Sequence, residues 1–283
     1  MQDFYIYHSV FLIFMFILGA AFGSFLCCQA RRLRLKQKGT KNNSPNSRPL
    51  GSRSVCLHCG HQLKWYDNLP ILSWLFLKGK CRKCQKKIGL AEFFSELGLA
   101  LAFVLIANNY NLVNLTTFSV WSEFIFALLL SLILGFLAIY DGLYGELPSL
   151  CLTLALICAI ILATLRQWVN FSVAGFSFEN LLPLLFSVLV LAGTYLILYL
   201  ISKGKWVGNG DWLLALALAL VLGHPWLALI TLFLANLLAC LIMLPAMKLN
   251  KKSRKTTKVY LGPFLVSAFI IVLSFSNFFL SML

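Results

Sequence analysis

Two aspartates lie at the ends of apolar runs, where their carboxyl groups could act in acid–base catalysis. Asp141 closes one apolar run, and Asp211 opens another within the motif Gly208-Asn-Gly210-Asp211. Two carboxyl groups that lie close together cannot both ionise, so such a pair shares one proton. The ionised partner can take a proton from water while the protonated partner donates to a peptide carbonyl. A pair of this kind would hydrolyse a peptide bond without a metal or a covalent intermediate.

The residues around the two aspartates leave alternatives open. Gly208 and Gly210 allow another chain to come close, so we predict that they bind an extended substrate backbone. Asp211 could instead be a plain helix N-cap. Asp141 could be an interfacial residue in a short loop, and Glu146 could replace one member of the pair or cap a helix.

Four of the nine cysteines form two C-x₂-C pairs, a pattern typical of a tetrahedral structural zinc site. Gly60 and Lys83 fit turns whose backbone N–H groups face the thiolates. A redox pair or a site without metal is the alternative, although reduced cytoplasmic thiols disfavour disulfides. The remaining five cysteines lie in or beside apolar runs, where we expect small buried hydrophobic residues. The predicted zinc ligands are Cys56, Cys59, Cys81 and Cys84.

The elements that must position these residues are membrane helices. Of the 283 residues, 60% are hydrophobic and only 12% are charged, which excludes a water-soluble domain. Apolar runs of about 20 residues predict an all-α polytopic membrane protein with about eight transmembrane helices. The run 212–223 is short for a straight crossing. The eight predicted runs are 6–28, 92–108, 123–140, 147–165, 180–201, 212–223, 225–247 and 259–282.

The basic residues predict the orientation of these helices. Residues 29–91 carry fifteen of the 24 lysines and arginines, and 248–258 carry six more. By the positive-inside rule both segments are cytoplasmic and the N-terminus is external. Both aspartates are then expected at the cytoplasmic boundary of the membrane. A basic nucleic-acid groove is the alternative; we expect no nucleic-acid partner, and membrane lipids as neighbours of the basic loops.

Three parts of the chain follow from this arrangement. Residues 1–28 are the first transmembrane helix. Residues 29–91 are a small cytoplasmic zinc-ribbon-like tetracysteine module, whose stretch 36–54 has a loop composition. Residues 92–283 are the membrane-embedded domain that carries the two aspartates. Within the first helix, Gly19-x-x-x-Gly23 is typical of close helix packing.

Motifs along most of the chain resemble the bacterial type IV prepilin peptidases, which are G-x-G-D aspartic membrane proteases. The resemblance implies cleavage of the short basic leader of prepilins or pseudopilins at the cytoplasmic face of the inner membrane, with Asp141 and Asp211 as the catalytic pair. It also implies N-methylation of the new N-terminus by S-adenosylmethionine, in type IV pilus, type II secretion or competence systems. The motifs are Gly19-Ala-Ala-Phe-Gly23-Ser-Phe-Leu26, Arg53-Ser-Val-Cys56-Leu-His-Cys59, Leu63-Lys-Trp65-Tyr66-Asp67-Asn68-Leu-Pro70, Gly79-Lys-Cys81-Arg82-Lys-Cys84, Asp141 with Pro148, Gly208-x-Gly210-Asp211 and Gly262-Pro263-Phe264.

The chain departs from the family pattern at Leu213, where a lysine is common, and at Ser149, where an acid is common. Three other functions compete with the resemblance: a G-x-G-D protease for other substrates, a proton-coupled transporter, and a zinc-ribbon membrane adaptor. The sequence shows no fingerprint for S-adenosylmethionine, so its binding residues are unknown. Glu92 and Glu96 could face a cationic cofactor or pair with the basic loop. The surface 65–68 could bind a ligand or pack the zinc module. The oligomeric state is not predicted.

Overall fold

The computed structural model describes residues 2–37, 55, 56, 58–110, 118–174, 181–249 and 260–281. Nearly all of these residues are helical, and six of the helices among them are long and apolar enough to cross a membrane. The prediction of an all-α membrane protein is therefore confirmed. The chain divides into two compact units, Met1–Val104 and Leu105–Leu283. The predicted loop at 36–54 and the basic cluster at 248–258 lie largely outside the described residues.

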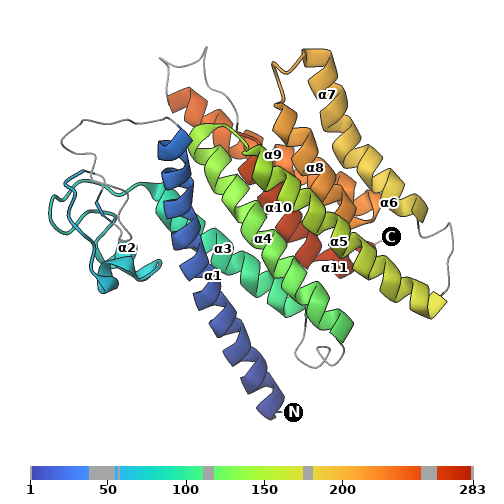
Figure 1. Ribbon diagram of the computed structural model, residues 1–283, viewed down its shortest axis with the longest axis horizontal. Helices are drawn as coiled ribbons and strands as arrows, with labels where there is room; N and C mark the ends of the chain where they lie inside the picture. Colours follow the sequence, from blue (N-terminus) through green and yellow to red (C-terminus); the bar gives the residue numbers. More distant parts are fainter. Residues whose placement is uncertain are drawn as a thin grey trace. The chain divides into compact units, whose positions relative to one another are not determined.

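The first unit contains α1 (Gln2–Gln37), a 3-10 turn η1 (Trp65–Asn68), α2 (Leu72–Phe76) and most of α3 (Leu90–Asn109) (Figure 1). α1 continues well past the apolar run 6–28 and includes the basic residues up to Gln37. Arginine, lysine and glutamine are good helix formers, so the helix does not end where its apolar part ends. Its 36 residues extend over about 54 Å, whereas a bilayer core is about 30 Å thick.

Two glycines on α1 allow its backbone to approach α3 closely. A Cβ atom added at Gly19 would lie 2.6 Å from the Leu99 carbonyl oxygen, and one at Gly23 would lie 2.7 Å from Glu96 Cα. Both distances are shorter than real Cβ contacts, so no larger residue fits without moving the helices apart. The interpretation of Gly19-x-x-x-Gly23 as a helix-packing motif is confirmed.

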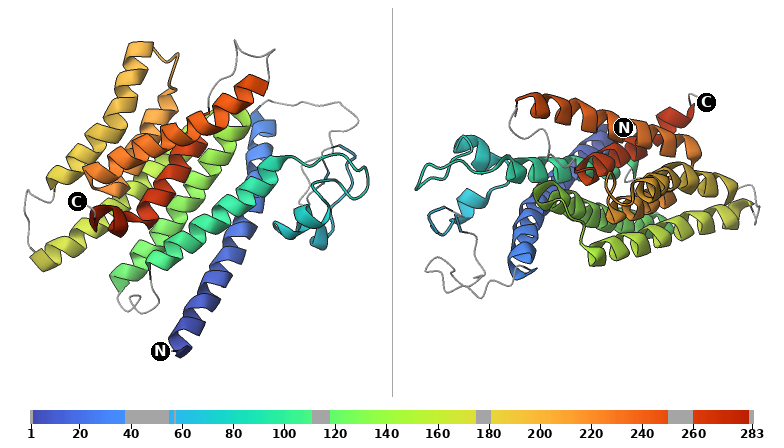
Figure 2. Two further views of the ribbon diagram at one scale, coloured as in Figure 1. Left: turned by 180° about the vertical axis from the view of Figure 1, so that it is seen from behind. Right: turned by 90° about the horizontal axis from the view of Figure 1, so that it is seen from above.

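The second unit is a helix bundle. α9 and α10 lie side by side in it, coloured orange and red (Figure 2). The segments α6, η4 and α7 form one continuous crossing over Leu181–Ser202, in which η4 is a π-helical turn. The elements after α3 are α4 (Phe118–Tyr144), α5 (Ser149–Ala174), α6 (Leu181–Val188), η4 (Leu189–Gly193), α7 (Thr194–Ser202), α8 (Asn209–Leu222), α9 (Pro225–Leu249), α10 (Gly262–Ser274) and α11 (Ser276–Ser281).

The short helix α8 is the centre of this bundle. It packs against α5, α6, α7, α9 and α10, and its buried side chains point to several sides. A helix that is apolar all round is one that other helices cover. Its 14 residues agree with the expectation that 212–223 is too short for a straight crossing. The buried residues of α8 are Leu214, Ala215, Ala217, Leu218, Ala219, Val221 and Leu222.

The last apolar run is divided in the structure, although one span over 259–282 was expected. α10 ends at Ser274, and α11 begins at Ser276. The Ser274 hydroxyl donates to the Ile270 carbonyl oxygen at 2.7 Å. Serine and asparagine side chains compete for backbone groups in this way, and the run Ser274-Phe-Ser276-Asn277 is rich in them.

Candidate active site and metal centre

The four predicted zinc ligands come together in the first unit. The sulfur atoms of Cys56, Cys59, Cys81 and Cys84 all lie within 4.8 Å of one another, and those of Cys56 and Cys84 are 3.9 Å apart. Four sulfurs at about 2.3 Å from one zinc ion would be separated by about 3.8 Å. The donor set and its spacing therefore fit a tetrahedral zinc ion.

Each C-x₂-C pair is built as the same short turn. The Cys56 N–H donates to the His61 carbonyl oxygen at 2.8 Å, and the Gly60 N–H donates to the Cys56 carbonyl oxygen at 2.9 Å. Cys81 and Gln85 make the matching bonds in the second turn. Gly60 and Gln85 both have a positive φ, 65° and 57°. The sequence pointed to Gly60, but a glutamine gives no signal for this backbone conformation.

Backbone N–H groups in the second turn stabilise a thiolate. Those of Cys84 and Lys83 donate to the Cys81 sulfur and lower the pKa of this thiol to about 7. The prediction that the Lys83 N–H faces a thiolate is confirmed. A thiol with a lowered pKa is a better metal ligand, because only the thiolate binds.

The module around the cysteines is anchored to the start of α3. The Ile71 N–H donates to Glu96 Oε2 at 2.7 Å, and the Trp74 and Phe93 rings lie 4.8 Å apart. Glu92 forms an ion pair with Arg31 on α1. The pairing of Glu92 with the basic segment is confirmed, although its Oε2 atom is buried with no hydrogen-bond partner among the described residues.

The surface at 65–68 is also held by local contacts. Arg82 Nε donates to Asp67 Oδ1 at 2.9 Å, and the Arg82 guanidinium lies 5.0 Å from the centre of the Tyr66 ring. These contacts join the 3-10 turn η1 to the second cysteine turn. Trp65 remains 78% exposed.

Asp141 is buried near the end of α4, with 5% of its surface exposed. Its Oδ2 atom accepts a hydrogen bond of 2.9 Å from the N–H of Gly262, the first residue of α10. The positive end of the α10 dipole therefore faces this carboxyl group. Asp141 lies within α4, so the alternative that it belongs to a short loop is wrong.

Asp211 lies in the first turn of α8, three residues after the N-cap Gly208. Its Oδ2 atom accepts a hydrogen bond of 2.8 Å from the Gly208 N–H, which is the acid half of a capping box. The alternative of a plain N-cap is wrong for this reason, although Asp211 does stabilise the helix start. The two helices that carry the aspartates, α4 and α8, both pack against α10.

The two glycines before Asp211 have different surroundings. A Cβ atom added at Gly210 would lie 2.8 Å from Leu147 Cδ1, so this glycine allows α8 to pack on the loop before α5. Gly208 is exposed, and an added Cβ would approach only its neighbours Gly210 and Asp211. Glu146 is exposed too. Contact of either glycine with a substrate stays a prediction.

Sequence reasoning about the pair did not find Gly262. A Cβ atom there would lie 2.7 Å from Asp141 Oδ2, so only glycine permits this close approach. The Tyr260 ring similarly covers Gly145, which has a φ of 67°. The motif Gly262-Pro263 signals the start of a helix, since proline is favoured in the first turn, but it does not signal the contact with Asp141.

Comparison with known proteins decides the family. Residues 17–110 match the model of the bacterial peptidase A24 N-terminal domain. A prepilin leader peptidase/N-methyltransferase from Dichelobacter nodosus is 32% identical over 216 residues, which cover 76% of this chain and 68% of that protein. The chain belongs to the prepilin peptidase family. No solved structure matches it.

Two further members of the prepilin peptidase family, which are also prepilin leader peptidase/N-methyltransferases, show how much of the chain is similar to its relatives. The protein of Legionella pneumophila is 30% identical over 247 residues, covering 84% of this chain and 76% of that protein. The protein of Vibrio cholerae serotype O1 is 39% identical over 93 residues, covering 33% of this chain and 34% of that protein. The match to the Vibrio protein thus spans about a third of its length. Together with the six long apolar helices, this family membership makes the chain a multi-pass membrane protein.

Proposed function

We propose that this chain is an aspartic endopeptidase that removes the leader of prepilin-like proteins, with Asp141 and Asp211 as its catalytic pair. One observation carries the proposal. Two carboxyl groups lie on two helices, α4 and α8, that both pack against α10, and a backbone N–H holds each of them. The names of the relatives support the choice of substrate.

The chemistry needs one proton shared between the two carboxyl groups. The ionised carboxylate takes a proton from water, whose oxygen attacks the carbonyl carbon of the peptide bond. The other carboxyl group donates its proton to the carbonyl oxygen. When the tetrahedral intermediate collapses, the C–N bond breaks and the amine nitrogen receives a proton. The Gly262 N–H fixes the orientation of Asp141 throughout.

We place this reaction at the cytoplasmic face of the bacterial inner membrane, with the N-terminus outside. The substrate is a prepilin or pseudopilin whose apolar helix lies in the membrane beside the enzyme. Its extended segment passes the exposed Gly208 at the start of α8. In this arrangement residues 1–28 are the first span, 29–91 a cytoplasmic module, and 92–283 the peptidase domain.

The four cysteines would hold a structural zinc ion, which fixes the geometry of a module too small to bury a core of its own. Zinc has no part in peptide hydrolysis in this proposal. N-methylation of the new N-terminus, with S-adenosylmethionine as the methyl donor, is supported by the names of the relatives. We assign no residue to that cofactor.

Cleavage by the purified protein tests the proposal. The detergent-solubilised chain is incubated with a prepilin, with and without S-adenosylmethionine, and the products are weighed by mass spectrometry. Asp141→Asn and Asp211→Asn are each expected to lower the rate at least ~10²-fold, because each removes an acid–base group. Glu146→Gln is the matched control and keeps its activity. Near-normal turnover in either aspartate variant rules out the pair.

A further inference from the structure

The second unit contains a cavity of about 340 Å³ that lies far from the two aspartates. It is bounded by the last turns of α8 and α10 and the first turn of α9, all of which are at one end of the bundle. Arg166 of α5 lies in its wall and reaches Glu123 near the start of α4. Glu123 and Asp141 are separated by about 27 Å along α4. The cavity and the candidate active site therefore belong to opposite ends of the same helices.

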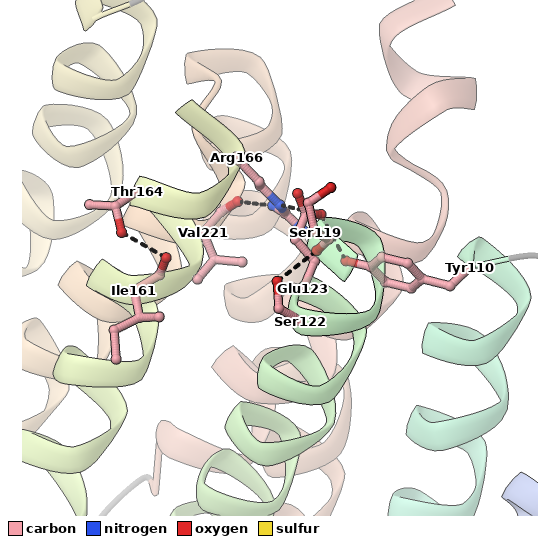
Figure 3. Close-up of polar contacts among 8 residues, drawn as sticks. All are labelled: Tyr110, Ser119, Ser122, Glu123, Ile161, Thr164, Arg166 and Val221. Atoms are coloured by element: carbon pink, nitrogen blue, oxygen red, sulfur yellow. Dashed lines mark hydrogen bonds and ion pairs between the residues drawn. The ribbon is translucent and has the colours of Figure 1, made fainter. Parts of the chain in front are cut away.

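Arg166, which lines this cavity, makes polar contacts with Val221 and Glu123 (Figure 3). Its Nη1 atom donates to the Val221 carbonyl oxygen at 2.6 Å, and its Nε atom lies 4.0 Å from Glu123 Oε2. The Tyr110 hydroxyl also donates to Glu123, at 3.4 Å. A guanidinium group has five N–H donors, and these contacts use only part of them. The contact with Glu123 is long, so Arg166 can bind a second anionic partner.

His224 adds a second polar group to the wall. It lies in the turn between α8 and α9, and its Nδ1 atom is buried with no hydrogen-bond partner among the described residues. A buried polar atom without a partner is costly, so one is expected to be supplied from the cavity. Asn277 on α11 lines the same space and carries an amide donor.

The depth of the cavity matches that of lipid headgroups. Trp121 near the start of α4 and Trp226 near the start of α9 are at this end, and they are 44% and 49% exposed. Exposed tryptophans mark the boundary between the hydrocarbon core and the headgroups. The remaining wall is largely apolar and includes Leu184, Leu227 and Leu280. A ligand for this space therefore combines an anionic group with hydrocarbon.

We propose that the cavity binds the phosphate group of a glycerophospholipid from the leaflet opposite the aspartates. The phosphate oxygens accept hydrogen bonds from Arg166 and from His224 in its Nδ1–H form. The start of an acyl chain lies against the leucines. A free phosphate ion offers the same oxygens without the hydrocarbon, so the test separates the two sources.

The test measures binding to the purified full chain in detergent. Phosphatidylglycerol, diacylglycerol of the same chain length and inorganic phosphate are added separately. Bound lipid is counted by native mass spectrometry, and the melting temperature is recorded for each. Phosphatidylglycerol is expected to bind and to raise the melting temperature, whereas diacylglycerol and phosphate do neither.

Two variants locate the site. Arg166→Gln removes the charged donor and is expected to weaken phosphatidylglycerol binding about tenfold or more, as loss of a charge-assisted hydrogen bond does. Ala163→Phe fills the cavity and leaves the contacts of Arg166 with Val221 and Glu123 in place, so it answers the question even if Arg166→Gln does not fold. Lys205→Gln, an exposed cation between α7 and α8, is the matched control and binds as before.

Unchanged phosphatidylglycerol binding in Ala163→Phe overturns the proposal. Equal binding of diacylglycerol would show that the phosphate is not recognised and overturns it as well. A shift produced by inorganic phosphate alone identifies a free anion as the ligand and excludes the lipid. None of these readouts depends on peptidase activity.

Discussion

Replacing Gly262 by alanine is expected to slow leader cleavage about 10- to 100-fold, although the residue takes no part in proton transfer. The added Cβ would lie 2.7 Å from Asp141 Oδ2 and 3.2 Å from its Cβ and Cγ atoms. The buried carboxyl group must move by several tenths of an ångström, which breaks the 2.9 Å bond from the Gly262 N–H. A hydrogen bond to a charged group is worth about 1.5–3 kcal/mol, and about 1.4 kcal/mol corresponds to a factor of ten in rate.

Gly142→Ala is the matched control for this change. Gly142 lies one residue after Asp141 within α4, and an added Cβ would meet only Pro263 Cγ, at an ordinary 3.5 Å. In a helix interior, alanine is favoured over glycine by about 0.5–1 kcal/mol. This variant is therefore expected to cleave normally and to be at least as stable as the parent chain.

The assay compares initial rates of prepilin cleavage at saturating substrate, normalised to folded protein by its thermal unfolding signal. The loss in Gly262→Ala is expected in kcat rather than in KM, because the change acts on the carboxyl group and not on the substrate helix. If both alanine variants cleave at the same rate, the Gly262 N–H does not position Asp141 for catalysis.

Three further outcomes follow from the contacts described above. The purified chain is expected to contain about one zinc ion per molecule by elemental analysis. The Cys81→Ser variant is expected to lose the zinc, whereas the control Cys151→Ala keeps it. Oxidation of the four ligands to paired disulfides would contradict the metal site. Gly23→Ala is expected to lower the melting temperature of the protein, because the added Cβ meets the α3 backbone. Gly98→Ala is the control, because its added Cβ meets nothing within 4 Å. Equal melting temperatures for the two variants would show that α1 and α3 can move apart without cost. Shortening the apolar helix of a prepilin is expected to raise KM more than removing one leader lysine, because the tetracysteine segment 29–91 is itself basic. The opposite order would mean that charge recruits the substrate.

Apolar length and charge were sufficient to predict most of the helices. A run of about 20 apolar residues has few alternatives in a membrane, and α3, α5 and α9 lie close to the runs that predicted them. Apolar runs do not predict helix ends as well. α1 continues through arginines that the apolar pattern excluded, and hydroxyl groups at Ser274 divide the last run.

The cysteine cluster was predictable because its ligand spacing is local, whereas the surroundings of the aspartates were not. Gly262 is 121 residues from Asp141 along the chain, and no pattern in either segment states that they meet. The packing of Leu147 beside Gly210 could not be predicted either. Contacts of this kind depend on helix packing, which a single sequence does not contain.

The short central helix α8 also bears on how the protein enters the membrane. Its 14 residues extend over about 21 Å, less than the hydrocarbon thickness of about 30 Å, so it cannot cross by itself as a straight helix. The turn at Gly223 and His224 leads directly into α9, which is long enough to cross. α8 and α9 therefore insert as a hairpin, with α9 supplying the hydrophobic length that α8 lacks. The turn between them forms part of the cavity wall, and Asp211 lies at the opposite end of α8.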